Sequence, residues 1–332
     1  MSAPDPTQAR FTSVARKAGH YESFYLKACH PAGGLGVWIR YTVHKPPGAE
    51  ALGSLWFTLF DAEAARPYAV KATLPGPSAG GGEWLAIGDA AIGPGRAVGA
   101  ASGEGREASW ELRFEAPERP LFHLPGDWMY GAPIPRTKLL SPAPAARFDG
   151  RVEAGGRQLE LSGWRGMIGH NWGSQHAERW VWLHGLGFDG PGDATWLDAA
   201  LGRVKLGPLT TPWVGNGALS LDGERLALGG PGRKVDVHER PDSCDFLLSG
   251  KGVRVRGSVS APRERFVGWV YADPDGSEHN TLNCSIADMR LAVERDGGPP
   301  LTLSLAGGAA YEFGMRERDH GMEIEPFGDG QP

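Results

Sequence analysis

Residues 180–188 read Trp-Val-Trp-Leu-His-Gly-Leu-Gly-Phe, a run with almost no polar side chain. Alternate residues of an extended strand point to opposite faces, so Trp180, Trp182 and His184 share one face and Val181 and Leu183 take the other. A strand that is apolar on both faces is expected where one side meets a core and the other lines a cavity. The run therefore predicts one wall of a curved β-sheet around an apolar space.

Two further runs, Val37–Val43 and Leu55–Phe60, are also apolar on both faces. Other runs alternate apolar and polar residues, as half-buried strands do. These alternating runs are Trp110–Phe114, Leu159–Trp164, Lys234–His238, Gly252–Val259 and Leu301–Leu305. Asp-Gly pairs, among them Asp149-Gly150 and Asp222-Gly223, separate the runs at the spacing of antiparallel hairpins. Because no long amphipathic helical window is evident, we expect an all-β protein.

A length of 332 residues favours two domains, and 50 Gly and 27 Pro beside 41% hydrophobic residues fit many short strands joined by tight turns. We expect an irregular or disordered N-terminus at 1–20, a first antiparallel barrel at 21–175 and a second at 176–328. The Gly-rich stretch Pro75–Gly105 and the Pro/Ala-rich stretch Ser141–Ala146 are expected to form loops. The run Tyr311–Phe327 is expected to be the last strand of the second barrel.

Charge and cysteine usage exclude several classes of function. A net charge of -5 without a basic stripe argues against nucleic-acid binding. The sequence has no export signal and no apolar run long enough to span a bilayer, so we expect a cytoplasmic protein. Cys29, Cys244 and Cys284 form no CxxC pair, which argues against disulfides and thiolate zinc sites. Since the chain has no dinucleotide or P-loop fingerprint, we expect no cofactor; the oligomeric state stays open.

Aromatic and titratable residues gather between Gly163 and Asp198, where Trp164, Trp172, Trp180, Trp182 and Trp196 accompany His170, His184 and Asp198. Burial raises the pKa of a carboxyl group and keeps it protonated, so a carboxyl and imidazoles among indoles predict an acid/base site in an apolar pocket. Indole faces also stabilise positive charge placed over them. A carbocation formed by protonating an alkene could therefore persist there.

The run Gly163-Trp-Arg-Gly-Met-Ile-Gly-His-Asn-Trp-Gly173, followed by Arg179–His184 and Trp196-Leu-Asp198, resembles the tandem-lipocalin superfamily. That superfamily includes carotenoid 1,2-hydratases (hydroxyneurosporene synthases), AttH-like proteins and, more remotely, tocopherol cyclases. The resemblance extends loosely from about Glu22 to Phe327 and implies two consecutive lipocalin-like, calycin-type antiparallel β-barrels. The opening segments Glu22–Leu26 and Trp38–Tyr41 also look like the first strands of that fold.

The resemblance also implies site residues. The His-x-Trp motif tied to activity in the hydratases matches His170 and Trp172, and their Tyr-x-Asp pair falls on Trp196 and Asp198. This sequence departs from the pattern in two places, since Trp196 replaces the Tyr and Gly169 stands where related sequences commonly have Asp. The Tyr hydroxyl and the carboxylate of the hydratase pattern are therefore absent from this sequence, while the fold and the apolar ligand that the resemblance implies are retained as expectations.

Three hypotheses follow. In the first, Asp198 and His170 protonate a C=C bond of a terpenoid- or polyketide-like substrate beside Trp172, giving hydration, cyclisation or isomerisation. The remaining substrate contacts would then come from Trp38, Trp164, Trp180, Trp182, His184 and Trp196. In the second, the barrels carry a hydrophobic metabolite without catalysis, as they would if Asp198 were ionised in a salt bridge with Arg179 or Arg203. A third, metal-assisted hypothesis uses His170, His176 and His184 with Asp198 or Glu178, in spacings that match no established zinc pattern.

Overall fold

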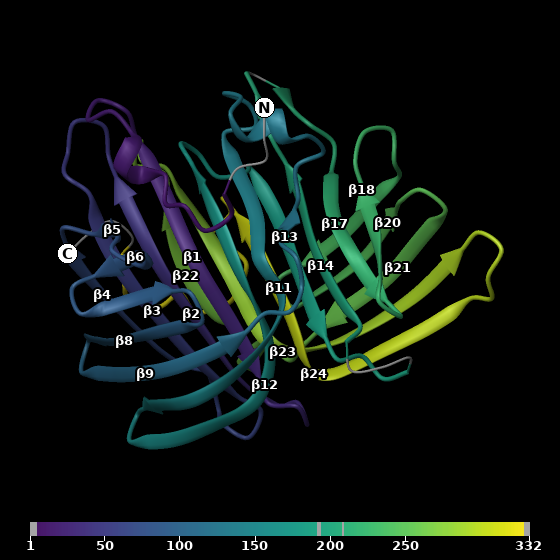
Figure 1. Cartoon of the computed structure of the whole chain (residues 1–332), viewed down its shortest axis with the longest axis horizontal. Coiled ribbons are helices and arrows are strands. Elements are labelled where there is room, and N and C mark those ends of the chain that lie inside the picture. Colours follow the sequence, from purple (N-terminus) through teal and green to yellow (C-terminus); the bar gives the residue numbers. More distant parts are fainter. Residues whose placement is uncertain (1–4, 191–193, 208, 329–332) are drawn as a thin grey trace.

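The computed structural model describes residues 5–190, 194–207 and 209–328, and it is almost entirely β-structure (Figure 1). The exceptions are three short 3-10 helices, η1 (Phe11–Ser13), η2 (Asp127–Tyr130) and η3 (Arg263–Arg265). Residues 1–4 of the predicted N-terminal segment lie outside the described residues. No helix in the described ranges has the length and apolar character needed to cross a bilayer.

The first sheet is built from the N-terminal half of the chain. Its strands are β1 (His20–Cys29), β2 (Leu35–Lys45), β3 (Leu52–Asp61), β4 (Tyr68–Pro75), β5 (Ser78–Gly80), β6 (Glu83–Ile87), β7 (Ala90–Gly93), β8 (Arg96–Gly103), β9 (Arg106–Glu115), β10 (Leu121–Phe122), β11 (Thr137–Ala154) and β12 (Arg157–Gly173). They pair in the order β4-β3-β2-β1-β12-β11-β9-β8-β7-β6-β5, and β10 adds to β11. Pairing of β1 with β12, from Tyr21 opposite Gly173 to Cys29 opposite Arg165, joins the two ends of this half.

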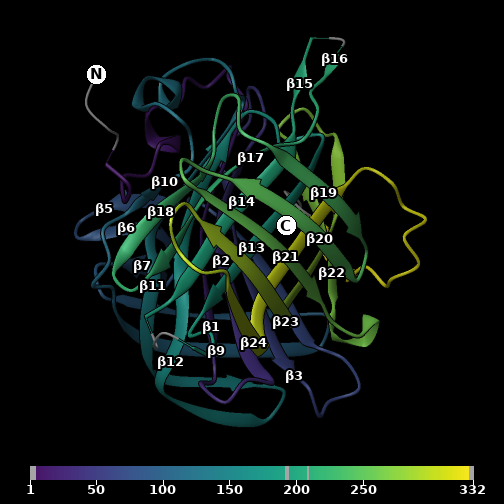
Figure 2. The same ribbon diagram turned by 90° about the vertical axis from the view of Figure 1, so that its right-hand side faces the viewer.

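The second sheet follows in sequence. Its strands are β13 (Arg179–Leu186), β14 (Trp196–Arg203), β17 (Val214–Leu221), β18 (Glu224–Gly229), β19 (Val235–Arg240), β20 (Ser243–Ser249), β21 (Val253–Ser260), β22 (Val267–Ala272), β23 (Glu278–Arg295) and β24 (Leu301–Met315). They pair in the order β18-β17-β14-β13-β24-β23-β21-β20-β19, and β22 adds to β23. A small hairpin of β15 (Lys205–Leu206) and β16 (Leu209–Thr210) projects from the sheet (Figure 2).

Both sheets are antiparallel and curled, and they lie side by side in Figure 1. In the second sheet, an isolated bridge from Leu228 to Gly250 brings β18 to the end of β20. One half-barrel and one nearly closed barrel thus follow each other along the chain. The predicted fold class, all-β with two consecutive antiparallel barrels, is confirmed.

Three local expectations were wrong. The Gly-rich stretch Pro75–Gly105 contains β5–β8, short strands joined by turns in which glycines adopt positive φ angles. The stretch Ser141–Ala146 lies inside β11, where register shifts accommodate its prolines, since a proline cannot donate a ladder hydrogen bond. The last strand ends at Met315 instead of continuing to Phe327.

Residues after Met315 return to the first sheet. Glu325 forms a 2.6 Å ion pair with Arg106 of β9, and Glu323 pairs with Arg66. Phe327 is buried against Trp269, with ring centroids 6.1 Å apart. We call residues 319–328 the C-terminal strap, because they tie the second half of the chain to the first.

The two sheets meet through an unusual layer of polar and aromatic side chains. Alternation puts one set of β1–β3 residues into the core of the first sheet and the other set against β13, β22, β23 and β24. Contacts across this layer include Trp38 with Trp269, at 6.4 Å between ring centroids, and the Lys27 Nζ, which donates to the Gly308 carbonyl at 2.6 Å. We call this layer the intersheet interface.

Candidate functional site

A cavity of about 470 Å³ opens where the intersheet interface meets the rim of the second sheet. The first half of the chain contributes Tyr25, Trp38, Arg40, His123 and Asn171 to its wall, and the second half contributes His176, Trp180, Trp182, Tyr271 and Glu312 among others. Apolar residues of the second sheet and its loops, such as Leu201, Trp213 and Val235, complete the lining. A ligand in this cavity would therefore contact both halves of the chain.

The predicted substrate-binding tryptophans divide into two groups. Trp38, Trp180 and Trp182 line the cavity. Trp164 and Trp196 are buried elsewhere: Trp164 packs edge-on against His30, and Arg225 lies over the ring of Trp196 at 5.0 Å. Strand β13 thus presents Trp180 and Trp182 to the cavity, as the alternation predicts, and Leu183 to the core. Val181 belongs to the core and also contributes to the cavity lining.

Asp198 lies directly behind this wall and is fully buried. Its Oδ1 accepts a hydrogen bond from Trp182 Nε1 at 3.1 Å, and its Oδ2 accepts one from Ser141 Oγ at 2.5 Å and lies 3.4 Å from His123 Nε2. Burial alone would raise the pKa of Asp198, but His123, with Ser141 and His184, outweighs it and holds that pKa below its ordinary value. The expectation of a raised carboxyl pKa was therefore wrong.

The partners of Asp198 also differ from the arginines considered in the sequence. Arg179 pairs with Glu239 and Glu317, and Arg203 donates to the Thr211 carbonyl. Asp198 instead supports two cavity-lining side chains, Trp182 and His123. In this position it can fix their orientation.

His170 and Trp172 lie at a different place, beneath the N-terminal segment. His170 Nε2 donates to Glu22 Oε1 at 2.8 Å, and Nδ1 lies 2.9 Å from the Pro6 carbonyl. Glu22 also accepts hydrogen bonds from the backbone N–H groups of Arg10 and Phe11, and Arg10 lies over the Trp172 ring. We call this cluster the N-terminal latch; it pins residues 6–11 to β1 and β12.

His184 is enclosed in the intersheet interface. Its Nε2 donates to the Pro144 carbonyl at 2.9 Å, and its Nδ1 lies 3.4 Å from Lys27 Nζ. Burial, followed by the charge of Lys27, lowers the pKa of His184 to about 3, so the imidazole is neutral. His184 thus bridges β13 to β1 and β11 and lies away from the cavity lining.

Tyr25 accounts for the glycine at position 169. A Cβ at Gly169 would lie 2.1 Å from Tyr25 Cζ, so the tyrosine ring fills the space that an aspartate side chain would need. Tyr25 is itself part of the cavity wall and packs edge-on against Trp182. The departure at Gly169 therefore exchanges a carboxylate for an aromatic wall residue.

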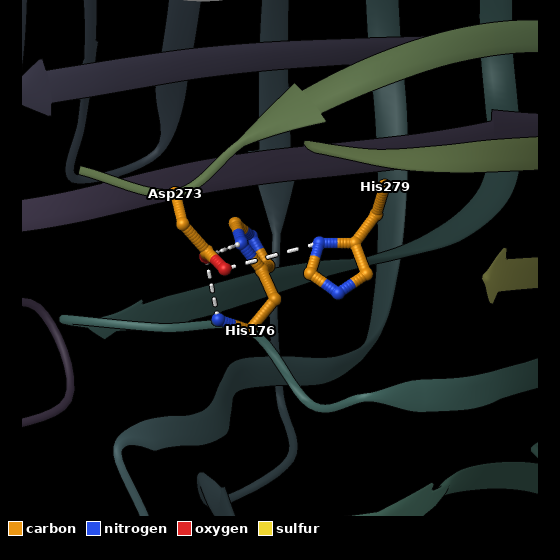
Figure 3. Close-up of side chains that lie close together, drawn as sticks. All are labelled: His176, Asp273 and His279. Atoms are coloured by element: carbon orange, nitrogen blue, oxygen red, sulfur yellow. Dashed lines mark hydrogen bonds and ion pairs between the residues drawn. The ribbon is translucent and has the colours of Figure 1, made fainter. Parts of the chain in front are cut away.

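The structure brings together a group that the sequence did not predict: His176, Asp273 and His279 (Figure 3). His176 lines the cavity, stacks on Tyr21 at 3.9 Å and has its Nδ1 2.7 Å from Asp273 Oδ1. The same oxygen accepts the His176 backbone N–H, also at 2.7 Å. Among the described residues, His176 Nε2 is buried without a hydrogen-bond partner.

The charges of this group favour an oriented histidine. Burial would raise the pKa of Asp273, but its hydrogen bonds with His176 outweigh that effect and hold the pKa below its ordinary value. Burial and then His176 lower the pKa of His279 to about 3. The Asp273 carboxylate accepts the Nδ1–H of His176 and so orients the ring, which leaves Nε2 as the nitrogen that can exchange a proton with a bound molecule.

The same three residues could hold a metal ion, because one donor atom from each lies within 4.8 Å of the others. Two ligands of a tetrahedral zinc ion, each about 2.1 Å from it, lie about 3.4 Å apart. The separation of His176 Nδ1 and Asp273 Oδ1 is 2.7 Å, a hydrogen-bond distance. We therefore interpret the group as a His–Asp pair. The metal set considered from the sequence is dispersed, because His170 and His184 bind the partners given above.

Other wall residues were also missed. Arg40 stands within the run Val37–Val43, which was predicted to be apolar on both faces, and Glu312 stands in the predicted last strand that begins at Tyr311. Glu312 accepts hydrogen bonds from Trp180 Nε1 at 3.0 Å, Asn283 Nδ2 at 3.1 Å and Tyr271 at 3.2 Å. A charged residue inside a doubly apolar run is the signal that could have identified Arg40.

Comparison with known proteins adds the following. No family model matches the chain. The uncharacterised proteins MT0513 and Rv0493c, from two strains of Mycobacterium tuberculosis, are each 25% identical over 307 residues, which cover 90% of this chain and 87% of theirs. The similarity thus spans nearly the full length of all three proteins.

Two crystal structures are similar in fold. An AttH candidate (NE1406) from Nitrosomonas europaea has a TM-score of 0.48 and 12% identity, over 93% of this chain and 97% of its own. Kievitone hydratase from Nectria haematococca has a TM-score of 0.48 and 10% identity, over 89% of this chain and 88% of its own.

Proposed function

We propose that this protein binds an apolar, terpenoid- or polyketide-like small molecule in the cavity between its two halves and catalyses cofactor-independent acid/base chemistry at a C=C bond. The observation that carries the proposal is an aromatic cavity with an Asp-oriented histidine, His176, in its wall. Hydration, cyclisation and isomerisation of an alkene can each begin with transfer of a proton to one carbon of the C=C bond. Positive charge then develops on the other carbon, and aromatic faces stabilise it.

Each part of the wall has a role in this proposal. With Asp273 as its counter-ion, the His176 imidazolium donates its Nε2 proton to one carbon of the C=C bond. The neutral imidazole then accepts a proton from a neighbouring carbon, or from the water that adds, and so returns to its starting form. Trp180 and Trp182 cover the apolar body, and their faces stabilise positive charge on it. Asp198 positions Trp182 and His123 from behind. The predicted catalytic roles of His170 and Trp172 stay hypotheses, because both lie in the N-terminal latch.

A non-catalytic carrier is the second candidate. The observation in its favour is the enclosure of Asp198, whose carboxyl group accepts hydrogen bonds from Trp182 and Ser141 and lies outside the cavity lining. These contacts do not suit the proton donor that the sequence-based mechanism requires. A carrier needs the apolar cavity and no proton transfer. The two candidates therefore predict the same ligand and differ in what becomes of it.

The first experiment is native mass spectrometry of the protein purified from its own cells, followed by extraction and identification of the retained molecule. We expect one apolar compound per chain, and its mass or double-bond pattern should change on incubation with fresh protein. A protein that retains nothing and binds no member of a lipid panel would overturn the proposal.

Variants then separate catalysis from carriage. His176→Gln should lower turnover of the extracted compound at least about 100-fold, with retention nearly unchanged. Asp198→Asn should lower turnover by a smaller factor, because Asp198 acts only by positioning Trp182 and His123. His238→Gln is the matched control, since His238 lies on the exposed side of β19. Equal turnover in all three variants would contradict the catalytic roles, and unaltered ligand with the wild type would favour the carrier.

A further inference from the structure

Arg40 is a buried cation that forms no ion pair with the described residues. Arg40 belongs to β2, and its side chain lines the cavity. The residue is only 4% exposed. The guanidinium lies 4.0 Å from the centroid of the Tyr271 ring and 5.6 Å from that of Trp56. Among the described residues, no carboxylate forms an ion pair with Arg40, and its NH1 nitrogen is buried without a hydrogen-bond acceptor.

The nearby carboxylate in the wall does not pair directly with Arg40. Glu312 accepts hydrogen bonds from the neutral donors Trp180, Tyr271 and Asn283, which together use both of its oxygens, so its charge acts on Arg40 only from the other side of Tyr271. Two aromatic faces beside Arg40 stabilise a cation only weakly, by about 0.5–2 kcal/mol each. A buried guanidinium without a direct ion pair therefore favours a bound anion that can pair with it. A water molecule could satisfy an N–H group but would supply no negative charge.

We infer that the cavity binds an apolar carboxylic acid, whose carboxylate pairs with Arg40 while its hydrocarbon body lies along Trp38, Trp180 and Trp182. This inference rests on the proposed small-molecule function and names the class of ligand. The single positive charge of a guanidinium matches one negative charge. Its planar pairs of N–H groups can donate two parallel hydrogen bonds to the two oxygens of a carboxylate. Arg233, the other arginine of the lining, is exposed at the rim and can hydrate freely.

The inference fixes the orientation of the ligand in the cavity. Arg40 comes from the first half of the chain, whereas His176, Trp180 and Trp182 come from the second. Anchoring the carboxylate at Arg40 would place the apolar body against the indoles. The reacting bond would then lie at a set distance from the carboxylate, a specificity that an apolar cavity alone does not provide.

The test compares dodecanoate with dodecanol, which share a hydrocarbon chain, by competition against the neutral dye Nile red. We expect the wild-type protein to bind dodecanoate at least about tenfold more tightly than dodecanol. Arg40→Gln should remove this preference while leaving dodecanol and Nile red binding nearly unchanged. Arg40→Lys should retain part of the preference, because it keeps the charge without the fork. Arg233→Gln is the matched control and should keep the full preference.

Each outcome has a distinct meaning. Equal affinity of the wild-type protein for the acid and the alcohol would overturn the inference and leave the apolar cavity supported by Nile red. Failure of all three probes to bind would overturn the proposed function as well. If Arg40→Gln does not fold, the ratio measured with Arg40→Lys decides, and a wild-type ratio in that variant would contradict a bidentate role for Arg40.

Discussion

Glu22 shows how one buried charge can organise a terminus. Its carboxylate accepts hydrogen bonds from two backbone N–H groups of the N-terminal segment and from the imidazole of His170. Burial alone would raise the pKa of Glu22, but the bonds from His170 and His20 outweigh it and bring the pKa to about 2. The histidine of the His-x-Trp motif is thus occupied with a structural ion pair.

The lowered pKa of Glu22 predicts acid sensitivity. A carboxyl group whose folded-state pKa lies below 4.5 stabilises the fold at pH values above 4.5, and this contribution is lost as the pH falls toward about 2. Its size is about 3 kcal/mol. Glu22→Gln should therefore lower the free energy of unfolding at neutral pH and flatten its decline in acid, as urea unfolding across that range would measure. Glu50→Gln, at an exposed carboxylate, should leave the profile unchanged. Parallel profiles for all three proteins would contradict the assignment.

At the scale of elements, the C-terminal strap is a connection that no strand pairing provides. It leaves β24 in the second sheet and places Glu325 against Arg106 and Phe327 against Trp269. Trp269 in turn packs on Trp38 and Trp56 of the first sheet. The strap therefore packs against the intersheet interface at Trp269.

Removing the aromatic anchor of the strap should weaken the whole fold. Phe327→Ala deletes a buried ring and should lower the free energy of unfolding by about 3 kcal/mol, measured by chemical denaturation. Glu323→Ala is the control in the same segment, because its side chain is 76% exposed; the change there should stay within about 0.5 kcal/mol. Equal effects of the two substitutions would contradict the anchoring role of the Phe327 ring.

At the scale of the whole molecule, the two sheets share their buried layer. Lys27 reaches from β1 to the Gly308 carbonyl of β24, and Arg40 of β2 stacks on Tyr271 of β22. Separation of the halves would expose the tryptophans of the interface and the buried Lys27 together. We therefore expect the chain to unfold as one unit although it contains two sheets.

Differential scanning calorimetry tests this cooperativity. A single transition, with a ratio of calorimetric to van't Hoff enthalpy of about 1, is expected for the full chain. Trp269→Ala, at the interface, should shift the midpoint of that one transition downward without splitting it. Two resolved transitions in the wild-type protein would show that the halves unfold independently.

Local sequence pattern predicted the class of fold, because period-two alternation and doubly apolar runs are properties of neighbouring residues. It missed β5–β8, since short strands rich in glycine have few side chains to alternate. The site was predicted in part. Trp180 and Trp182 follow from the alternation of one strand, whereas the pairing of His176 with Asp273 joins residues 97 positions apart. Arg40 was missed because its side chain faces the second sheet, and local sequence does not reveal which strands of another sheet lie opposite.

The position of the cavity across the intersheet interface has a practical consequence for finding the ligand. A molecule bound there is a crosslink between two halves that unfold together, so its binding free energy adds to the stability of the entire chain. At a free concentration of about 100 times Kd, this amounts to about 2.7 kcal/mol. A rise in melting temperature can therefore identify the ligand from a chemical library before any reaction is known.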